Sequence, residues 1–317
     1  MPAPDGLIDV HHHAIPPAYR EALGDRVAIP GVDYPTWSPE TSLEVMDRHG
    51  IAASVLSVTA PGVSFLEGTE RIRMARQVNE YYAGLLAGHP TRFGAFAVLP
   101  LPDVAAAKDE LAYAIDELGL DGVAMLTSYG DRYLGDPEFE PLLAEIADRG
   151  LPLHVHPAAP PARDLQTFDL PASLYDFTFE TTRTVVSLLF NGVLTRLPHL
   201  KLIVSHAGGT LPFLAKRLTY GPTIGKYLTE RAPADVIGTL RGIYYDIAMS
   251  ANEFALPALT ELAAPDRILF GSDYPFMPAE HTTENVTGFR TYAGWSERQR
   301  TAIGRDNALA LFPRLAG

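Results

Sequence analysis

The segment Leu200–Gly209, with the sequence LKLIVSHAGG, decides the fold that we expect for this chain. Lys201–Ser205 has the length and the Val and Ile content of a buried strand, and His206 follows it before two glycines. A histidine is costly to bury inside such a strand unless its ring nitrogens find partners. At the carboxyl end of a parallel strand it reaches the edge where α/β barrels place their chemistry. The segment therefore predicts a functional histidine at a strand end.

Three other apolar stretches also end on histidine or aspartate. The four stretches of this form, each with the residues that follow it, are Leu7–Val10 (His11, His12, His13), Leu153–Val155 (His156), Lys201–Ser205 (His206) and Ile268–Gly271 (Ser272, Asp273). The carboxyl ends of parallel strands in a barrel meet at one face. We therefore expect these side chains to lie close together and to form a metal site.

Strand patterns alternate with helical patterns along the whole chain. The eight expected strands are Leu7–Val10, Ala53–Thr59, Phe93–Leu99, Gly122–Leu126, Leu151–Val155, Lys201–Ser205, Gly242–Ile247 and Arg267–Gly271. Eight such units predict an α/β fold, a (β/α)8 TIM barrel, distorted by an N-terminal insertion at Ile15–Pro39 and ending in a C-terminal helix, Ser296–Leu311. An open doubly wound sheet is the alternative, but it predicts a G-x-G-x-x-G turn that the sequence lacks. With no linker or repeat, we expect residues 1–317 to form one domain.

Composition narrows the possible functions. The 317 residues are 47% hydrophobic, which supplies a large core, and they include no cysteine, which excludes disulfides, thiolate ligands and a cysteine nucleophile. The formal net charge of −13 argues against nucleic acid or an anionic membrane as partner. The N-terminus lacks the basic and apolar regions of a signal peptide, and no apolar run approaches a membrane span. We expect a cytoplasmic protein.

The histidines near the N-terminus are the first candidate metal ligands. His11 and His13 are two residues apart, and strand alternation points both to the same side, where they can hold one ion. Imidazole suits Zn²⁺, Mn²⁺ or Fe²⁺. A tag remnant is the alternative, but the strand-like residues Ile8–Val10 precede the histidines. His12 is expected to point the opposite way.

The other strand ends supply the remaining candidates. His154 and His156 share one side of their strand; we expect one to be a ligand and the other a hydrogen-bonded interior residue, and the end position favours His156. His206 is either a capped core histidine or a catalytic group, and the glycines after it leave room for a substrate. Asp273 alone would be read as a turn aspartate. Its place beside four histidines at equivalent ends favours a functional role.

Together these motifs resemble a known family. Ile8–His13, His156-Pro157, Ser205–Gly209 and Gly271–Phe276 are similar to the motifs of the amidohydrolase superfamily, and in particular of its metal-dependent non-oxidative decarboxylases. The similarity extends from about residue 7 to Phe312. That branch includes the aminocarboxymuconate-semialdehyde decarboxylases and the 6-methylsalicylate decarboxylases.

The resemblance implies a (β/α)8 barrel with one divalent ion, Zn²⁺ or Mn²⁺. The residues that match its ligands are His11, His13, His156 and Asp273, and His206 matches an acid/base group. It further implies a homodimer in which an arginine eleven residues beyond that histidine, here Arg217, enters the neighbouring subunit's site and holds a carboxylate. Without the resemblance, Arg217 would be read as a solvated helix residue.

One departure from the family pattern concerns the substrate. Aminocarboxymuconate-semialdehyde decarboxylases have a second carboxylate-binding arginine just before a Met-Asp-x-x-Gly segment, but here Thr41–Val45 precede Met46–Gly50 and contain no arginine. Loss of a bidentate guanidinium clamp argues for a monocarboxylate. Val55–Val58 and Ala60–Val63 look more like the 6-methylsalicylate type. The candidate walls of a pocket for a phenolic acid, each of which could equally be a core residue, are Phe65, Tyr129, Tyr175, Phe177 and Phe276.

The expected reaction is therefore decarboxylation of an ortho-hydroxybenzoate such as 6-methylsalicylate. A proton is added to the ring carbon that bears the carboxylate, and CO₂ leaves. Asp273 is the preferred donor with His206 as relay, and His206 as donor is the alternative. A second hypothesis is hydrolysis of a lactone, ester or amide by metal-activated water, with Asp273 as general base. A non-catalytic metal-binding protein is the third.

Overall fold

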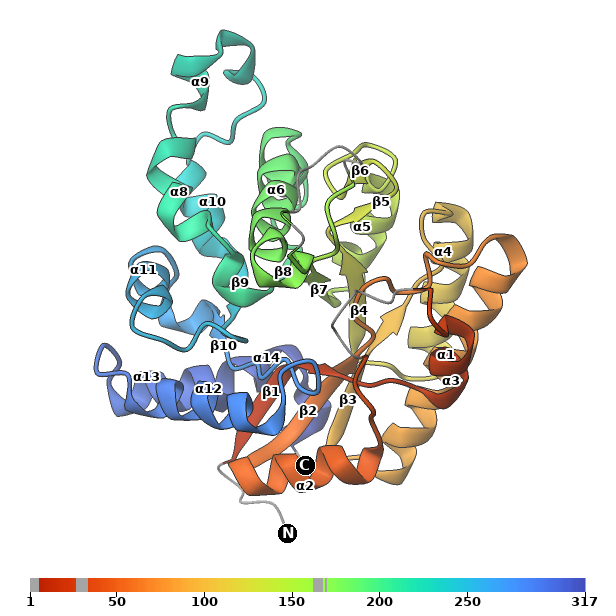
Figure 1. Cartoon of the computed structure of the whole chain (residues 1–317). Helices are drawn as coiled ribbons and strands as arrows, with labels where there is room; N and C mark the ends of the chain where they lie inside the picture. Colours follow the sequence, from red (N-terminus) through yellow and green to blue (C-terminus); the bar gives the residue numbers. More distant parts are fainter. Residues whose placement is uncertain (1–5, 27–33, 162–167, 169, 317) are drawn as a thin grey trace.

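The chain forms a barrel of eight parallel strands, as a computed structural model that describes residues 6–26, 34–161, 168 and 170–316 shows (Figure 1). Its strands, in sheet order, are β1 (Leu7–His13), β2 (Ile51–Ser57), β3 (Phe93–Val98), β4 (Gly122–Leu126), β7 (Pro152–His156), β8 (Lys201–Val204), β9 (Tyr244–Asp246) and β10 (Ile268–Leu269). Every neighbouring pair of this sheet is parallel. The predicted (β/α)8 barrel is confirmed.

The segment after β10 closes the barrel against β1. The backbone N–H of Val10 donates to the carbonyl of Phe270 at 3.0 Å, and that of His13 donates to the carbonyl of Tyr274 at 2.7 Å. The N–H of Asp273 in turn donates to the carbonyl of His11 at 2.8 Å. These bonds place Asp273 directly beside the histidines at the end of β1.

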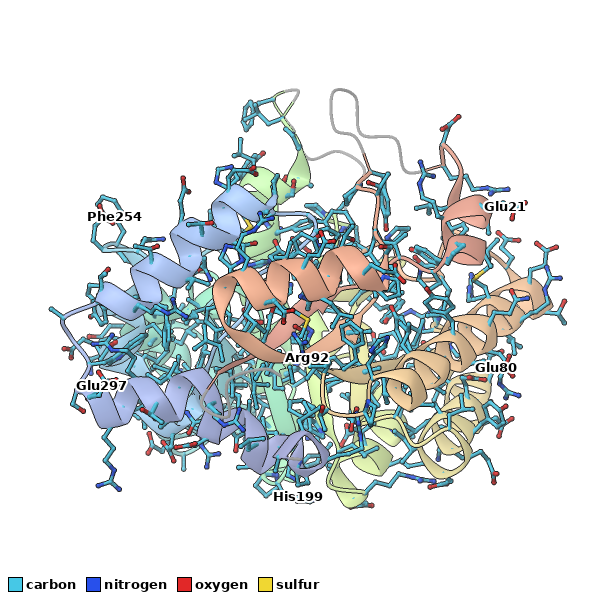
Figure 2. All side chains as sticks on the ribbon, turned by 90° about the horizontal axis from the view of Figure 1, so that it is seen from below. Glu21, Glu80, Arg92, His199, Phe254 and Glu297 are labelled. Carbon is cyan, nitrogen blue, oxygen red and sulfur yellow. The ribbon has the colours of Figure 1, made fainter. Side chains whose placement is uncertain are left out.

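Helices surround the barrel in a ring (Figure 1), and Figure 2 shows the side chains on these elements from below. They are α1 (Pro17–Leu23), α2 (Pro39–His49), α3 (Gly68–Gly88), α4 (Val104–Ala112), α5 (Glu140–Asp148), α6 (Asp176–Phe190), α7 (Val193–Arg196), α8 (Leu211–Leu218), α9 (Gly221–Ile224), α10 (Val236–Gly242), α11 (Ala255–Leu262), α12 (Ala279–Thr291), α13 (Glu297–Thr301) and α14 (Asn307–Leu311). A short hairpin, β5 (Ser128–Tyr129) and β6 (Arg132–Tyr133), follows β4. In the described part of the chain, no helix is both long and apolar enough to cross a membrane.

Capping residues set where two of the helices begin. Helix α2 begins at Pro39, because Ser38 caps it through a reciprocal bond with Thr41 and Pro39 takes the first helical position. The expected C-terminal helix Ser296–Leu311 does start with Ser296 and Gln299 as its capping box, but the π-helical turn Ala302–Asp306 separates α13 from α14. The N-terminal insertion contains α1, and its residues 27–33 lie outside the described residues.

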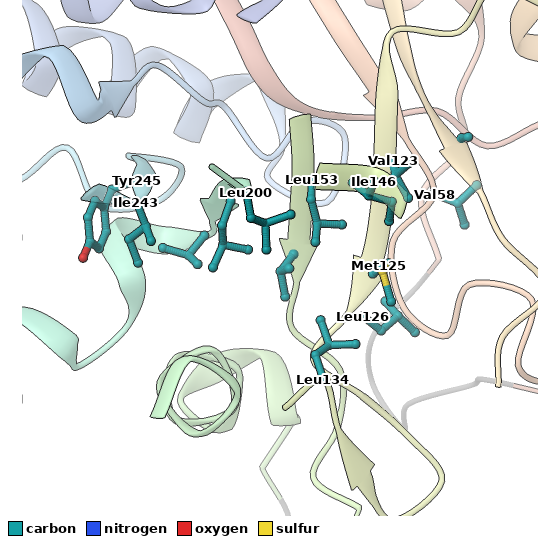
Figure 3. Packing of buried hydrophobic residues seen from close by; sticks show 14 of the residues in the cluster. Val58, Val123, Met125, Leu126, Leu134, Ile146, Leu153, Leu200, Ile243 and Tyr245 are labelled. Carbon is teal, nitrogen blue, oxygen red and sulfur yellow. The ribbon is translucent and has the colours of Figure 1, made fainter. Parts of the chain in front are cut away.

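The core consists of apolar side chains between the strands and the outer helices. Figure 3 shows a row of such side chains, which includes Val123, Leu153 and Ile243. A second cluster joins the strands to the C-terminal helix, where Ala308 and Phe312 pack with strand residues such as Phe96. Large buried side chains such as these contribute about 1.5–3 kcal/mol each to folding. This packing holds the strand ends rigidly in place.

Candidate metal centre

Three histidines and one aspartate converge at the carboxyl ends of the strands. His11 and His13 come from β1, His156 from the end of β7, and Asp273 from the segment after β10. One ligand atom of each residue lies within 4.8 Å of the ligand atoms of the other three, and all four residues are buried. The structure thus brings together the four residues that sequence analysis selected as ligands.

The distances inside this cluster suit a single cation. Nε2 of His11 lies 3.1 Å from Nε2 of His13 and 3.2 Å from Oδ1 of Asp273. Nε2 of His13 and Oδ1 of Asp273 are 3.0 Å apart. Two nitrogens bound tetrahedrally to one zinc ion, with Zn–N bonds of about 2.0–2.1 Å, lie about 3.3 Å apart. Three imidazoles and a carboxylate are also donors that Zn²⁺ and Mn²⁺ accept. The residues therefore fit the metal that the resemblance implies.

Burial and neighbouring charges shift the pKa values of the cluster. Burial disfavours the charged form of His11, but the carboxylates of Asp246 and Asp273 together outweigh it and raise the pKa of His11 to about 10. Burial lowers the pKa of His13 to about 4 and that of His156 well below its usual range. Burial alone would raise the pKa of the Asp273 carboxyl, but its bonds to His11 and His13 hold that pKa well below its usual range. A cation bound here would take the place of the proton on His11.

His206 lies beside the cluster but outside it. Its ring centroid is 5.0 Å from that of His11 and 6.0 Å from that of His156. Its Nδ1 is 3.1 Å from the carbonyl oxygen of Ala248, so Nδ1 donates there and Nε2 is left for another partner. His206 and Ala207 both have a φ of 56°, a strained conformation that is frequent at functional sites.

Helix α6 holds the turn that carries His206. The Thr182 hydroxyl donates to the carbonyl of Thr178 at 2.8 Å and accepts the backbone N–H of Thr210 at 2.9 Å. Gly209, at a φ of +63°, lies so close to α6 that a Cβ there would be 2.0 Å from the carbonyl oxygen of Thr178. The glycine that sequence analysis interpreted as room for a substrate therefore also permits close packing of the turn against α6.

The other neighbouring histidines take structural partners. Nδ1 of His12 bonds Oδ2 of Asp9 at 3.0 Å, and its Nε2 bonds the hydroxyl of Ser42 at 2.9 Å, so His12 points away from the cluster as predicted. Nε2 of His154 lies 3.0 Å from Oδ2 of Asp246. Of the two histidines of β7, His156 thus lies in the cluster and His154 is a hydrogen-bonded interior residue, and the ligand role of His156 stays a prediction.

The predicted aromatic residues fall into two groups. Phe276 lies edge-on to His13 with ring centroids 5.3 Å apart, and Phe177 lies edge-on to His156 at 6.0 Å, so both flank the cluster. Tyr129 is not brought to the cluster in the same way: its hydroxyl accepts the backbone N–H of Leu126 at 2.9 Å and its ring packs on Phe139.

Two further aromatic candidates and Arg217 lie away from these contacts. Phe65 packs against Tyr19 with ring centroids 5.8 Å apart, and Tyr175 packs against Phe179. Arg217 is exposed on α8. A cavity of about 550 Å³ is lined by other residues, which include Met249, Ser272 and Met277.

Sequence analysis missed Asp246, the buried carboxylate at the end of β9. It contacts His11, His154 and the backbone of His206. Its signal was present, because Gly242–Ile247 was expected to be a strand and an aspartate near the end of a barrel strand has the same form as the other four sites.

Comparison with known proteins agrees with this geometry. The sequence profile described as amidohydrolase matches residues 8–314. The chain is 39% identical to decarboxylase yanB of Aspergillus niger, over 97% of this chain and 87% of that protein. It is 37% identical to 6-methylsalicylic acid decarboxylase of Penicillium expansum, over 98% of this chain and 97% of that protein.

A solved structure extends the similarity to the fold. The dihydroxybenzoic acid decarboxylase of Polaromonas sp. JS666, which has bound manganese and the inhibitor 2-nitroresorcinol, superposes with a TM-score of 0.81 at 25% identity. The superposition covers 97% of each chain. The profile match spans nearly the whole chain, and the decarboxylases above share more than a third of their aligned residues with it. The chain therefore belongs to the amidohydrolase family.

Proposed function

We propose that this protein is a metal-dependent, non-oxidative decarboxylase of an ortho-hydroxybenzoate, with 6-methylsalicylate as the first candidate substrate. The observation that carries the proposal is the convergence of His11, His13, His156 and Asp273, with His206 at their edge. Relatives that match nearly the whole chain are named as decarboxylases, one of them of 6-methylsalicylic acid.

The four clustered residues would hold one divalent cation, Zn²⁺ or Mn²⁺. The related dihydroxybenzoic acid decarboxylase contains manganese, which supports this assignment. When bound, the cation supplies positive charge that neutralises the carboxylate and the adjacent phenolic oxygen of the substrate. Phe276 and Phe177, which flank the cluster, would hold the aromatic ring and exclude water.

His206 is the residue that we assign to proton delivery. Its Nδ1 is anchored on the carbonyl of Ala248, so Nε2 is the nitrogen that can carry a proton to the substrate. Oδ1 of Asp273, by contrast, lies among the ligand nitrogens of His11 and His13. The proton from His206 adds to the ring carbon that bears the carboxylate. The bond to the carboxylate then breaks, its electron pair restores the aromatic ring, and CO₂ leaves.

Phe276 and Phe177 are the aromatic substrate contacts that the geometry favours. Tyr129 stays a prediction from sequence, since its hydroxyl already accepts a backbone N–H. A single carboxylate on the substrate agrees with the lack of arginine in Thr41–Val45.

We further infer that the protein is a homodimer in which Arg217 reaches the neighbouring site. Helices α8 and α9 protrude from the ring of helices (Figure 1). They and the adjoining turn expose large apolar side chains: Phe213 is 86% exposed, and Ile224 and Tyr227 are each 72% exposed. Apolar surface of this kind usually marks an interaction site. Arg217 lies on the same helix as Phe213, so a second copy that covers this surface would also meet Arg217.

Turnover of a substrate panel tests the proposed reaction. Metal-reconstituted protein is incubated in H₂¹⁸O with 6-methylsalicylate, other monohydroxybenzoates and a set of lactones and esters. The proposal predicts CO₂ release from an ortho-hydroxybenzoate and no ¹⁸O in the phenolic product. Hydrolysis of a lactone or ester with ¹⁸O in the product, without CO₂ release from any acid, would overturn it.

Subunit mixing tests the role of Arg217. The variants Arg217→Ala and His206→Ala are each expected to be inactive. In a dimer that shares sites, a refolded mixture recovers about a quarter of wild-type activity, because half of the dimers are mixed and each has one intact site. A mixture as inactive as its components, with dimers verified by sedimentation, would contradict the shared site.

A further inference from the structure

We propose that Asp246 is a positioning residue that fixes the tautomer of His11 and, through its other oxygen, the turn that carries His206. The proposal rests on the proposed metal site, and its test is a measurement of metal binding. Asp246 ends β9 and is fully buried. It belongs neither to the four clustered residues nor to any contact that the proposed reaction has used.

Each oxygen of Asp246 accepts two hydrogen bonds. Oδ2 lies 2.9 Å from Nδ1 of His11 and 3.0 Å from Nε2 of His154. Oδ1 accepts the backbone N–H groups of His206 and Ala248, each at 3.0 Å. A carboxylate has about four acceptor positions and no donor when ionised, so this environment of four donors matches it fully. A side chain that donates a hydrogen bond here would bring its hydrogen against the hydrogen of at least one of these four donors.

Oδ2 determines which nitrogen of His11 faces the cation. Because Nδ1 donates to Asp246, Nε2 is the nitrogen left to bind a metal, and it is Nε2 that lies near Nε2 of His13 and Oδ1 of Asp273. Ligating histidines commonly depend on such a partner for ring orientation and basicity. Asp246 thus prepares His11 for its ligand role.

Oδ1 of Asp246 holds the turn that carries His206. The backbone N–H of His206 and that of Ala248 share this oxygen, and the carbonyl of Ala248 accepts Nδ1 of His206. One carboxylate oxygen therefore fixes both the main chain of His206 and the peptide that orients its ring. Both His206 and Met249, the residue after Ala248, have a positive φ, so the two segments depend on such bonds to keep a strained shape.

His11, His154 and Asp246 could also be read as a second metal cluster. The contacts of Asp246 favour a hydrogen-bonded group over a second metal site. Both nitrogens lie at hydrogen-bond distance from the same oxygen, and the opposite oxygen is already used by two backbone N–H groups. Nδ1 of His154 is buried without a partner among the described residues, which agrees with a neutral ring whose proton is on Nε2. The proposal therefore assigns no metal to this group.

Asp246→Asn shows whether Asp246 fixes the tautomer of His11 or only holds the neighbouring residues in place. The two backbone N–H groups at Oδ1 can only donate, so the amide oxygen of asparagine must face them and its NH₂ must face His11 and His154. His11 must then accept at Nδ1, which moves its proton to Nε2 and blocks metal binding. Asp246→Ala removes the acceptor but leaves both tautomers of His11 accessible.

The test is the Zn²⁺ dissociation constant, measured by chelator competition at one pH on wild type and both variants. Affinity is expected to fall about 10–100-fold in Asp246→Asn, and less in Asp246→Ala. Asp9→Asn is the matched control, since Asp9 is equally buried but bonds the ring of His12, and it meets the ligand His11 only at the backbone N–H, which an asparagine oxygen can still accept. It should change the affinity less than either Asp246 variant does. Equal affinities in Asp246→Asn and wild type, or a smaller loss in Asn than in Ala, would overturn the proposal.

A measurement on wild-type protein protects the test against variants that fail to fold. Zn²⁺-loaded protein with ¹⁵N-labelled histidine should show His11 protonated at Nδ1 and bound to the metal through Nε2. Binding through Nδ1 would overturn the proposal. If the wild type binds Zn²⁺ in this way but decarboxylates no acid of the panel, the proposed reaction fails while the role of Asp246 stands.

Discussion

Replacing Gly209 by alanine tests whether the turn that carries His206 depends on its packing against α6. Gly209 has a φ of +63°, and a Cβ there would lie 2.0 Å from the carbonyl oxygen of Thr178 and 2.9 Å from the hydroxyl oxygen of Thr182. The left-handed conformation costs an alanine about 1–2 kcal/mol. Overpacking against backbone, which cannot rotate aside as a side chain does, costs about a further 1–3 kcal/mol. We expect Gly209→Ala to lower the free energy of unfolding by about 2–5 kcal/mol.

We expect Gly209→Ala to disturb the turn that carries His206 and to leave the four proposed ligands in place. The four proposed ligands lie on β1, on β7 and after β10, so metal content should stay near that of the wild type while turnover falls as His206 moves. Thermal unfolding, metal analysis and turnover are measured on the same preparation. The control is Gly84→Ala in α3, where a Cβ meets nothing within 4 Å and the change should be neutral or stabilise by about 0.4–1 kcal/mol. Gly209→Ala with the stability and turnover of the wild type would refute the packing argument.

Three other substitutions have distinct expected outcomes. Asp273→Asn should lose most of its bound metal at stoichiometric concentration, measured by metal analysis after gel filtration; near-normal metal content and turnover would exclude Asp273 as a ligand and as the proton donor. Phe276→Ala removes a ring that lies 5.3 Å from that of His13, so kcat/KM should fall about tenfold or more with metal content unchanged. Tyr133→Phe removes the 2.7 Å bond to the buried carboxylate of Glu180 and should destabilise the protein by about 1–3 kcal/mol in thermal unfolding, with Zn²⁺ affinity unchanged.

Local patterns predicted the barrel and the convergence of three histidines and one aspartate, because both depend on strand ends. A buried parallel strand is a short apolar run, and the residue after it is placed by the sheet itself. His11, His13, His156 and Asp273 could therefore be placed together although up to 262 residues separate them.

Features that depend on contacts between distant segments were not predicted. Helix α12 is rich in Thr and contains Gly288, which weakens its helical pattern. Gly288 nevertheless has a packing role, since a Cβ there would lie 1.8 Å from the carbonyl oxygen of Ala251. The hairpin of β5 and β6 has strands of two residues, too short for a periodic signal.

Asp246 was missed for a different reason. It lies one residue inside the expected strand Gly242–Ile247, whereas the selected candidates follow their strands. Only the structure brings its carboxylate to His11, 235 residues away in the chain. The aromatic candidates also required coordinates, because the choice between a pocket wall and a core residue depends on side-chain direction. Phe276 lies at the cluster, whereas Tyr129 bonds the backbone of β4.

Turnover in D₂O tests the central claim most directly. Metal-reconstituted protein is incubated with 6-methylsalicylate and other ortho-hydroxybenzoates, and both CO₂ and the deuterium content of the phenol are followed. The account predicts CO₂ release with one deuterium at the vacated ring carbon, and loss of both in His206→Ala that still binds metal. No CO₂ from any of these acids, with the metal shown to be bound, would contradict it.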